Sequence, residues 1–132
     1  CKKIAAANVV FTGRLSQKEL SSYYRKAKVH VLPSWFETCG LSSLEAAAMG
    51  CNIVITDKGF TRDYFGKEAF YCDPQSPESI YNAVLAASKA KSSWNLKEKI
   101  INEFTWTQAA KKTLQAYQMI LSTNKKLLLN ES

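Results

Sequence analysis

Two glutamates, Glu37 and Glu45, lie on either side of Gly40 in an otherwise small and apolar stretch. An ionised carboxylate only accepts hydrogen bonds, and it can take two hydroxyl donors at once. The vicinal hydroxyl groups of a ribose or hexose meet that demand. Gly40 permits a backbone turn that a side chain would obstruct. The spacing therefore predicts a site in which two carboxylates bind sugar hydroxyl groups across a turn.

The residues after Gly40 add an anion site to this pair. A short helix is expected over residues 41–49, ended by Gly50. The backbone N–H groups at its start have no helical carbonyl partner, and the positive end of the helix dipole lies beside them. A phosphate over these amides would have one carboxylate on each side. We therefore expect a ligand with phosphate in the middle and sugar hydroxyls at both ends, which is a nucleotide sugar.

Strands and helices that could position these residues alternate along the chain. Apolar, β-branched runs predict strands at 8–12, 29–33, 52–56 and 69–72, and helices are expected at 16–27, 41–49, 77–90, 95–104 and 107–121. Strands that are apolar on both faces suit a parallel sheet covered by helices on both sides. The sequence therefore predicts an α/β class with a doubly wound, Rossmann-like parallel sheet, whose ligands bind beyond the carboxyl ends of the strands.

The length suits one domain, which we expect over 1–121, followed by a basic tail over 122–132. The net charge of +7 is uneven: residues 1–34 carry seven Lys/Arg against one acid, and 35–80 carry three against seven. The basic ends leave open a polyanion-binding or interaction module without enzymatic activity, or a peripheral contact with an anionic membrane. The acidic middle argues against one continuous nucleic-acid surface, so no nucleic-acid partner is expected.

The cysteines and the single histidine show no metal-binding spacing. Cys1, Cys39, Cys51 and Cys72 form no C-x-x-C pair, and His30 completes no zinc set with them. We expect reduced thiols and a cytoplasmic location, and no apolar run approaches the ~20 residues of a membrane span. His30 is expected to be a core residue. The aromatic residues expected to pack in the interior are Tyr23, Tyr24, Trp94, Trp106 and Tyr117.

Two further residues lie in the loops expected at the ligand-binding edge. Ser34 follows a strand-ending proline, and it is equally consistent with a site residue and with a simple turn residue. Phe60 lies in the loop after the strand at 52–56, which faces the same edge.

Cys39 lies at the turn itself, where a helix N-terminus lowers the pKa of a thiol. No general base lies near Cys39 in the sequence, so a nucleophilic role is not expected.

The stretch NVVFTGRLSQKELSSYYRKAKVHVLPSWFETCGLSSLEAAAMGCNIVIT carries several motifs together. They are F-x-G after the first strand, Pro-Ser after the second, the E-x7-E pair, Gly-Leu after its first glutamate, and E-A-x-x-x-G at the helix end. With the later FTWTQAAKKTLQAY, they resemble the C-terminal, donor-nucleotide-binding half of a GT-B retaining glycosyltransferase of family 4 (glycosyl transferases group 1). The resemblance covers about residues 8–120.

The resemblance implies a role for each matching residue. Glu37 would contact the donor hexose as the catalytic glutamate, and Glu45 would hold the ribose hydroxyls. In the family, one turn approaches the diphosphate and one loop lies near the base. The residues that match the turn are Cys39, Gly40 and Leu41, and those that match the loop are Gly13 and Arg14. The implied reaction transfers a hexosyl group with retention from a nucleotide-diphosphate sugar to a glycan or lipid acceptor, as in bacterial polysaccharide or glycoconjugate synthesis. No metal and no cofactor besides the donor substrate are expected.

The chain departs from the family pattern at several points. Thr38 replaces the usual glycine after the first glutamate, and Gly59-Phe60 replaces the usual Gly-Gly. The resemblance also implies that the first strand and helix of the domain lie upstream. The same holds for the Arg and Lys that bind the diphosphate and for an N-terminal acceptor domain of the same protein. For this chain alone we therefore expect weak donor binding and no turnover.

Overall fold

The structure, a computed structural model, describes the backbone of residues 2–130 and the side chains of residues 2–122. Its elements are η1 (Lys2–Ile4), α1 (Gln17–Lys26), β1 (Val29–Leu32), α2 (Leu41–Ala48), β2 (Asn52–Thr56), α3 (Thr61–Phe65), β3 (Phe70–Cys72), α4 (Pro77–Lys89), α5 (Trp94–Glu103) and α6 (Trp106–Asn130).

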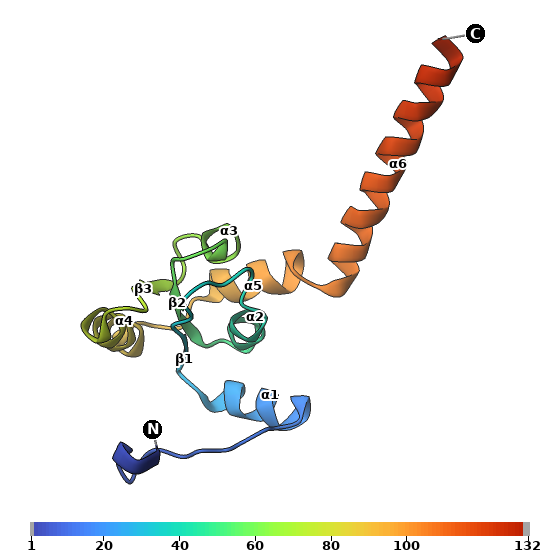
Figure 1. Cartoon of the computed structure of the whole chain (residues 1–132). Helices are drawn as coiled ribbons and strands as arrows, with labels where there is room; N and C mark the ends of the chain where they lie inside the picture. Colours follow the sequence, from blue (N-terminus) through green and yellow to red (C-terminus); the bar gives the residue numbers. More distant parts are fainter. Residues whose placement is uncertain (1, 131–132) are drawn as a thin grey trace.

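Three parallel strands form the sheet, in the order β1-β2-β3. Val54 in the central strand is in register with Val31 on one side and Phe70 on the other. Figure 1 shows α4 on one face of the sheet and α2 and α5 on the other, with α1 beside α2. The predicted α/β class, with a parallel sheet covered on both faces, is confirmed.

The strand β2 shows why both faces must be covered. All five of its residues are buried. Since successive side chains of a strand point to opposite faces, Ile53 and Ile55 pack with α1, α2 and α5, whereas Val54 packs with α4. Asn52 reinforces the second contact, because its side-chain amide donates to the carbonyl of Ala87 in α4 over 2.8 Å. The two small cores therefore share one central strand.

Helix α1 begins as its sequence predicts. The Ser16 hydroxyl accepts from the Glu19 N–H over 3.3 Å, and the Glu19 carboxylate accepts from the Ser16 N–H over 2.8 Å. This reciprocal capping box satisfies two N–H groups that the helix leaves unpaired. The capping box therefore sets the residue at which α1, the helix that packs beside α2, begins.

The strand predicted over 8–12 is wrong. These residues form no regular element, and Val9, Val10 and Phe11 are all about half exposed or more. A strand is stable only when neighbouring backbone groups pair with it. Within the described part of the chain, the N–H of Val9 instead donates locally to the carbonyl of Ala6. Figure 1 shows this segment running apart from the sheet.

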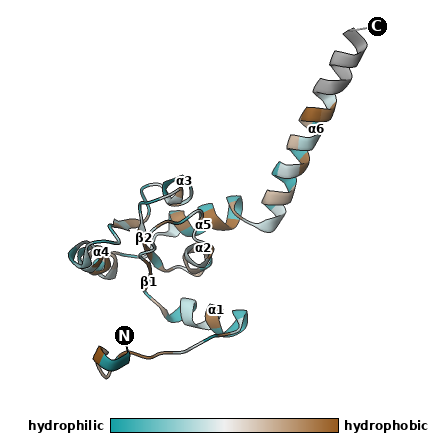
Figure 2. Ribbon diagram, in the orientation of Figure 1, coloured by the Kyte–Doolittle hydropathy of each residue, from teal (hydrophilic) through white to brown (hydrophobic). Residues whose placement is uncertain are grey.

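The prediction that five aromatic residues pack is confirmed only for Tyr24. The other four are more than half exposed: Tyr23, Trp94, Trp106 and Tyr117. Helical spacing indicates which side chains share a face, but a face is buried only where another element covers it. Figures 1 and 2 show α6, which carries Trp106 and Tyr117, extending away from the sheet with apolar positions along it.

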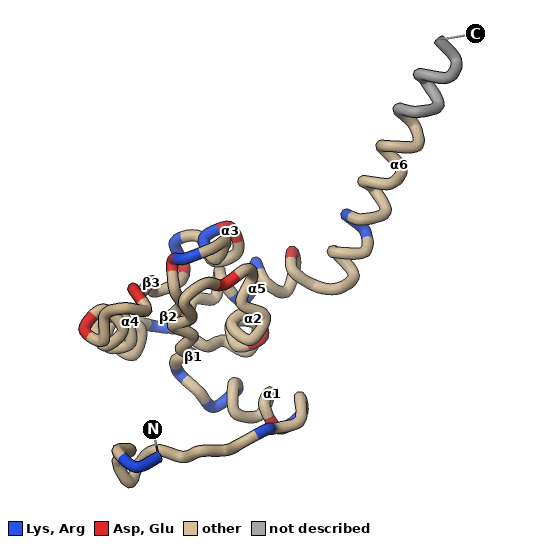
Figure 3. Tube along the Cα trace, viewed as in Figure 1, with Lys and Arg blue, Asp and Glu red and all other residues tan. Residues whose placement is uncertain are grey.

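Helix α6 continues past residue 121 to Asn130, and the predicted division into a domain and a basic tail stays a prediction. Residues 131–132 of the predicted tail lie outside the described residues. Figure 3 shows basic residues on the N-terminal segment and α1, and acidic residues around the sheet. Among the described residues, no helix is long and apolar enough to cross a membrane.

Candidate functional site

The loop after β1 is joined to the loop after β2 at Glu37. The Glu37 N–H donates to the carbonyl of Lys58, and the Phe60 N–H donates to the carbonyl of Glu37, both over 3.1 Å. Gly59 lies opposite Glu37 in this bridge, with a φ of +100°. A Cβ atom added to Gly59 would lie 2.0 Å from the Glu37 carbonyl oxygen. Only glycine fits there, and it lets the two loops hold Glu37 beyond the carboxyl ends of both strands.

The carboxylate of half-buried Glu37 is turned onto its own loop. One oxygen, Oε1, accepts from the N–H groups of Thr38 and Gly40, each over 3.2 Å. The other, Oε2, lies 3.5 Å from the hydroxyl of Ser34, which donates to it. Ser34 therefore lies beside Glu37, and its role in ligand binding stays a prediction. One of the amides expected to face a phosphate, that of Gly40, is engaged by a carboxylate of the chain itself.

Gly40 makes the sharp entry into α2. It is buried, with a φ of +64°, and an added Cβ would lie 3.0 Å from Cδ1 of Ile55. Helical bonding begins with the Leu44 N–H, which donates to the Gly40 carbonyl over 2.9 Å. The N–H groups of residues 41–43 therefore precede the helical ladder. Ser43 is fully buried there, and among the described residues its hydroxyl has no hydrogen-bond partner.

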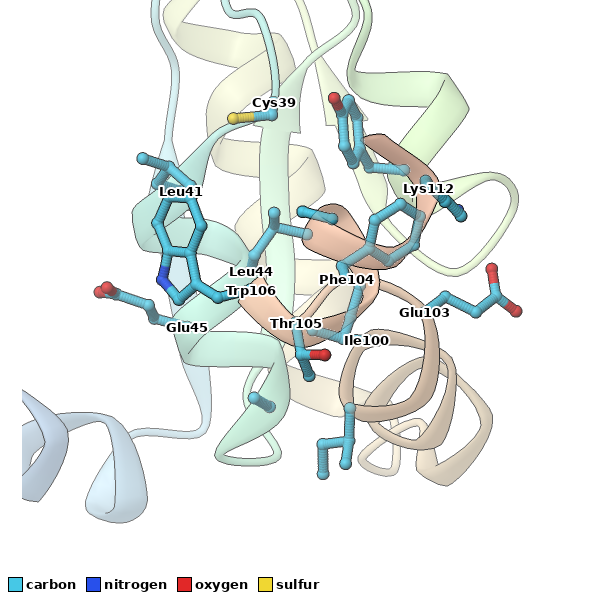
Figure 4. A pocket seen from close by; sticks show the side chains of 14 residues that line it. Cys39, Leu41, Leu44, Glu45, Ile100, Glu103, Phe104, Thr105, Trp106 and Lys112 are labelled. Carbon is cyan, nitrogen blue, oxygen red and sulfur yellow. The ribbon is translucent and has the colours of Figure 1, made fainter. Parts of the chain in front are cut away.

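Glu45 lies one turn into α2, exposed, between two cavities. The larger, of about 620 Å³, is bounded by α2, α5 and the start of α6, and Figure 4 shows its lining. Three predicted site residues line it: Cys39, Leu41 and Glu45. The smaller, of about 210 Å³, lies between α1 and α2, where Glu45 joins Gln17, Ser21 and Tyr24. Cavities of the larger size accommodate small-molecule ligands.

The predicted residues do not all meet in one place. Glu37 lies against Gly40, which leads into the helix that carries Glu45. Gly13 and Arg14 lie in the exposed segment before α1 and line neither cavity. The roles assigned to all these residues stay predictions.

Sequence reasoning missed Trp106 and Lys112, which line the large cavity. Trp106 is 85% exposed, and Figure 4 shows its indole on the same side of the cavity as Leu41 and Glu45. An exposed tryptophan beside a carboxylate gives the cavity a flat apolar surface next to an acceptor. The aromatic residue before the last helix was visible in the sequence, but its spacing indicated packing.

Burial controls the titratable groups close to the site. It raises the pKa of Tyr24, and the nearby charges of Glu45 and Cys51 add to that shift. Burial also raises the pKa of the Cys51 and Cys72 thiols, which keeps them protonated and poorly nucleophilic. The cysteines within the described residues are free. The two buried thiols therefore add no nucleophile to the site.

Known proteins share both sequence and fold with this chain. An uncharacterized glycosyltransferase of Methanocaldococcus jannaschii is 29% identical over 123 residues, which cover 86% of this chain and 31% of the relative. A D-inositol 3-phosphate glycosyltransferase of Paenarthrobacter aurescens is 31% identical over 121 residues, or 79% of this chain and 27% of the relative. The chain thus spans about a third or less of the length of these curated relatives.

The solved structure of sucrose-phosphate synthase from Thermosynechococcus elongatus superposes with a TM-score of 0.73 at 24% identity, covering 86% of this chain and 30% of that one. This likeness confirms the fold, a Rossmann-like half-domain of the GT-B type. The family model described as "Glycosyl transferases group 1" matches residues 2–120. Because that match covers most of its length, the chain belongs to the family of glycosyl transferases group 1.

Proposed function

We propose that the chain is the donor-binding domain of a retaining glycosyltransferase that uses a nucleotide-diphosphate sugar. The observation that carries this proposal is the arrangement around Gly40. Two carboxylates lie on either side of a buried left-handed glycine turn, and a helix begins directly after it. This arrangement supplies acceptors for hydroxyl groups on both sides of a set of anion-binding amides.

Each part of the donor then has a place. The diphosphate lies over the N–H groups of Gly40 and of residues 41–43, which precede the helical ladder of α2. The exposed carboxylate of Glu45, one turn further on, accepts hydrogen bonds from the ribose hydroxyls. Glu37 accepts from the hexose, and Gly13 and Arg14 lie toward the base. When the nucleoside diphosphate leaves, the same amides and the helix dipole stabilise its charge without rearranging.

Glu37 must change partners when the donor binds. In this structure its carboxylate occupies the N–H groups of Thr38 and Gly40. A phosphate group approaching the turn repels that carboxylate and competes for the same donors. We expect the carboxylate to move from the amides to the hexose hydroxyls as the diphosphate takes its place. Before the donor binds, the Thr38 and Gly40 N–H groups are therefore hydrogen-bonded to the same carboxylate that later binds the hexose.

The rest of the enzyme is part of the same proposal. A glycan or lipid acceptor would be held by an N-terminal domain of the same protein, which would also bring further cations to the diphosphate. We expect the amides of this site and the cations of that domain to stabilise the leaving diphosphate without a metal. The buried, free Cys51 and Cys72 suit a reducing cytoplasm, with the inner membrane face as the place where a lipid acceptor would be met.

Calorimetric titration with UDP, GDP and their sugars tests the proposal. We expect weak binding by the chain alone, and Glu45→Ala should weaken it by about tenfold or more, since hydrogen bonds to a charged group are worth ~1.5–3 kcal/mol. Glu98→Ala is the matched control, because Glu98 is an exposed helix residue that lines neither cavity. A polyanion-binding module would bind heparin with steep salt dependence, and Glu45→Ala would not weaken it.

A further inference from the structure

Two phenylalanine rings are exposed at the carboxyl edge of the sheet. Phe36 follows β1 and Phe60 follows β2, and 61% and 58% of their surfaces are exposed. The rings meet edge to face, with their centroids 6.4 Å apart. Ligands of parallel α/β sheets bind beyond this edge. None of the roles proposed above for the donor site uses either ring.

The backbone of Glu37 fixes both rings. Phe36 is its neighbour in the chain, and the Phe60 N–H donates to the Glu37 carbonyl over 3.1 Å. Gly59, whose position admits no side chain, holds this contact in place. The pair therefore moves with Glu37 rather than with a separate loop. The two rings and the Glu37 carboxylate are therefore carried by the same stretch of backbone.

A hexose ring can bind a carboxylate and an aromatic surface at the same time. Its edge carries hydroxyl groups, which a carboxylate accepts, while its faces carry C–H groups. The electron-rich face of an aromatic ring attracts such weakly positive hydrogens, and the contact also removes apolar surface from water. Ligand pockets commonly combine aromatic walls with a few placed polar groups in this way.

We propose that Phe60, supported by Phe36, is a further donor-binding residue that packs against the C–H face of the transferred hexosyl group. The proposal rests on the donor-binding function inferred above. Position 60 is also where the chain departs from the Gly-Gly pattern noted in its sequence. The aromatic side chain therefore adds sugar contact at a point where glycine would offer only backbone.

The experiment compares sugar-bearing and sugar-free nucleotides on the same variants. UDP, UDP-glucose, GDP and GDP-mannose are titrated calorimetrically into the wild-type chain, Phe60→Leu and Phe60→Tyr. We expect Phe60→Leu to lower the affinity for the nucleotide sugar about three- to tenfold, while the affinity for the nucleoside diphosphate stays within about twofold of the wild-type value. Phe60→Tyr, which keeps the ring, should bind like the wild type. Tyr81→Leu removes a similarly exposed ring from α4 and should change neither affinity.

Binding of the bare diphosphate reports whether the variant has kept its fold. Equal weakening of nucleotide sugar and diphosphate in Phe60→Leu, or no change in either, would overturn the aromatic subsite and leave the donor site standing. Loss of sugar affinity in Phe60→Tyr as well would also overturn it, because the ring is retained there. If the wild-type chain binds none of the four probes, the donor-binding function fails, and the subsite fails with it.

Discussion

At the scale of single residues, the site depends on one backbone contact. Glu37 follows β1, yet its N–H and carbonyl are both bonded to the loop after β2. That contact exists because Gly59 presents no side chain at a φ that other residues rarely adopt. Glu37 could be chosen as a site residue from its position before a glycine turn. The bridge to Gly59 could not, because it joins two loops through backbone atoms, and a glycine in a loop does not indicate which segment approaches it.

Gly59→Ala should therefore harm both stability and the site. A second glycine, Gly50, has nearly the same backbone angle, with a φ of +96° against +100°, but open space where a Cβ would lie. Gly50→Ala should lose about 1–3 kcal/mol to backbone strain alone. Gly59→Ala should lose that amount plus part of two backbone hydrogen bonds, worth ~0.5–1.5 kcal/mol each. Urea unfolding of the two variants measures the difference.

The effect on ligand binding separates the two variants further. Gly59→Ala displaces Glu37, so nucleotide-sugar affinity should fall in it and stay near the wild-type value in Gly50→Ala. Equal losses of stability and of affinity in the two variants would contradict the role given to the bridge.

His30 makes folding sensitive to acid. Burial lowers the pKa of His30 below its ordinary value of 6.5, and its ring packs edge to face against Tyr24 at 5.5 Å. The unfolded chain therefore takes up a proton at a higher pH than the folded one. Stability should be fully present above pH 6.5 and fall as the pH drops from there through the lowered folded value.

His30→Phe keeps an aromatic ring and removes the proton site, which isolates this effect. Its urea midpoint should change less than that of the wild type between about pH 7 and pH 5, a range that lies above the ordinary pKa values of most carboxylates. Parallel pH dependence in the two proteins would show that another group is responsible.

At the scale of elements, local signals succeeded where the element also has a covering partner. The Ser16–Glu19 capping box, the apolar run of β2 and the proline at the start of α4 each predicted an element that the structure contains. Residues 8–12 carry the same β-branched pattern, yet they form no strand, since a strand also requires a neighbour with free backbone groups. The short helix α3 was missed because five residues hold too little periodicity to reveal it.

The long helix α6 also shows that a sequence pattern does not reveal which element covers a helix face. Its helical pattern was recognised as far as residue 121, but nothing in that pattern says which element covers its apolar side chains. Leu114, Tyr117 and Ile120 are all more than half exposed. The exposure of Trp106, and hence the large cavity beside Glu45, follows from where α6 leaves the domain. Periodicity predicts an element, whereas a cavity depends on how elements meet.

At the scale of the whole molecule, the site and the core are one structure. Helix α5 comes after the last strand, yet Leu96 and Ile100 belong to the same buried cluster as Ile53, Ile55 and Leu44. The side chain of Ile55 also lies against the turn, since a Cβ added at Gly40 would lie 3.0 Å from its Cδ1. One face of the sheet thus supports both the glycine turn and the helix that bounds the large cavity. We infer that α5 cannot detach without loosening the site.

Leu96→Ala tests this coupling. Leu96 is 1% exposed, so its truncation should destabilise the fold by about 2–5 kcal/mol through lost burial and the cavity left behind. If α5 and the sheet unfold together, far-ultraviolet circular dichroism and tryptophan fluorescence should report one shared transition, shifted to lower urea. Trp94 at the start of α5 and Trp35 in the loop after β1 place fluorescent probes in both regions.

Leu85→Ala on α4 is the matched control, because Leu85 is 37% exposed and lies outside both buried clusters. Its loss should stay below about 1 kcal/mol, as is usual for partly exposed positions. Should Leu96→Ala instead give two separate transitions, with helix signal lost first, α5 would be an appended element. The large cavity would then open and close independently of the glycine turn, and donor affinity would survive the first transition.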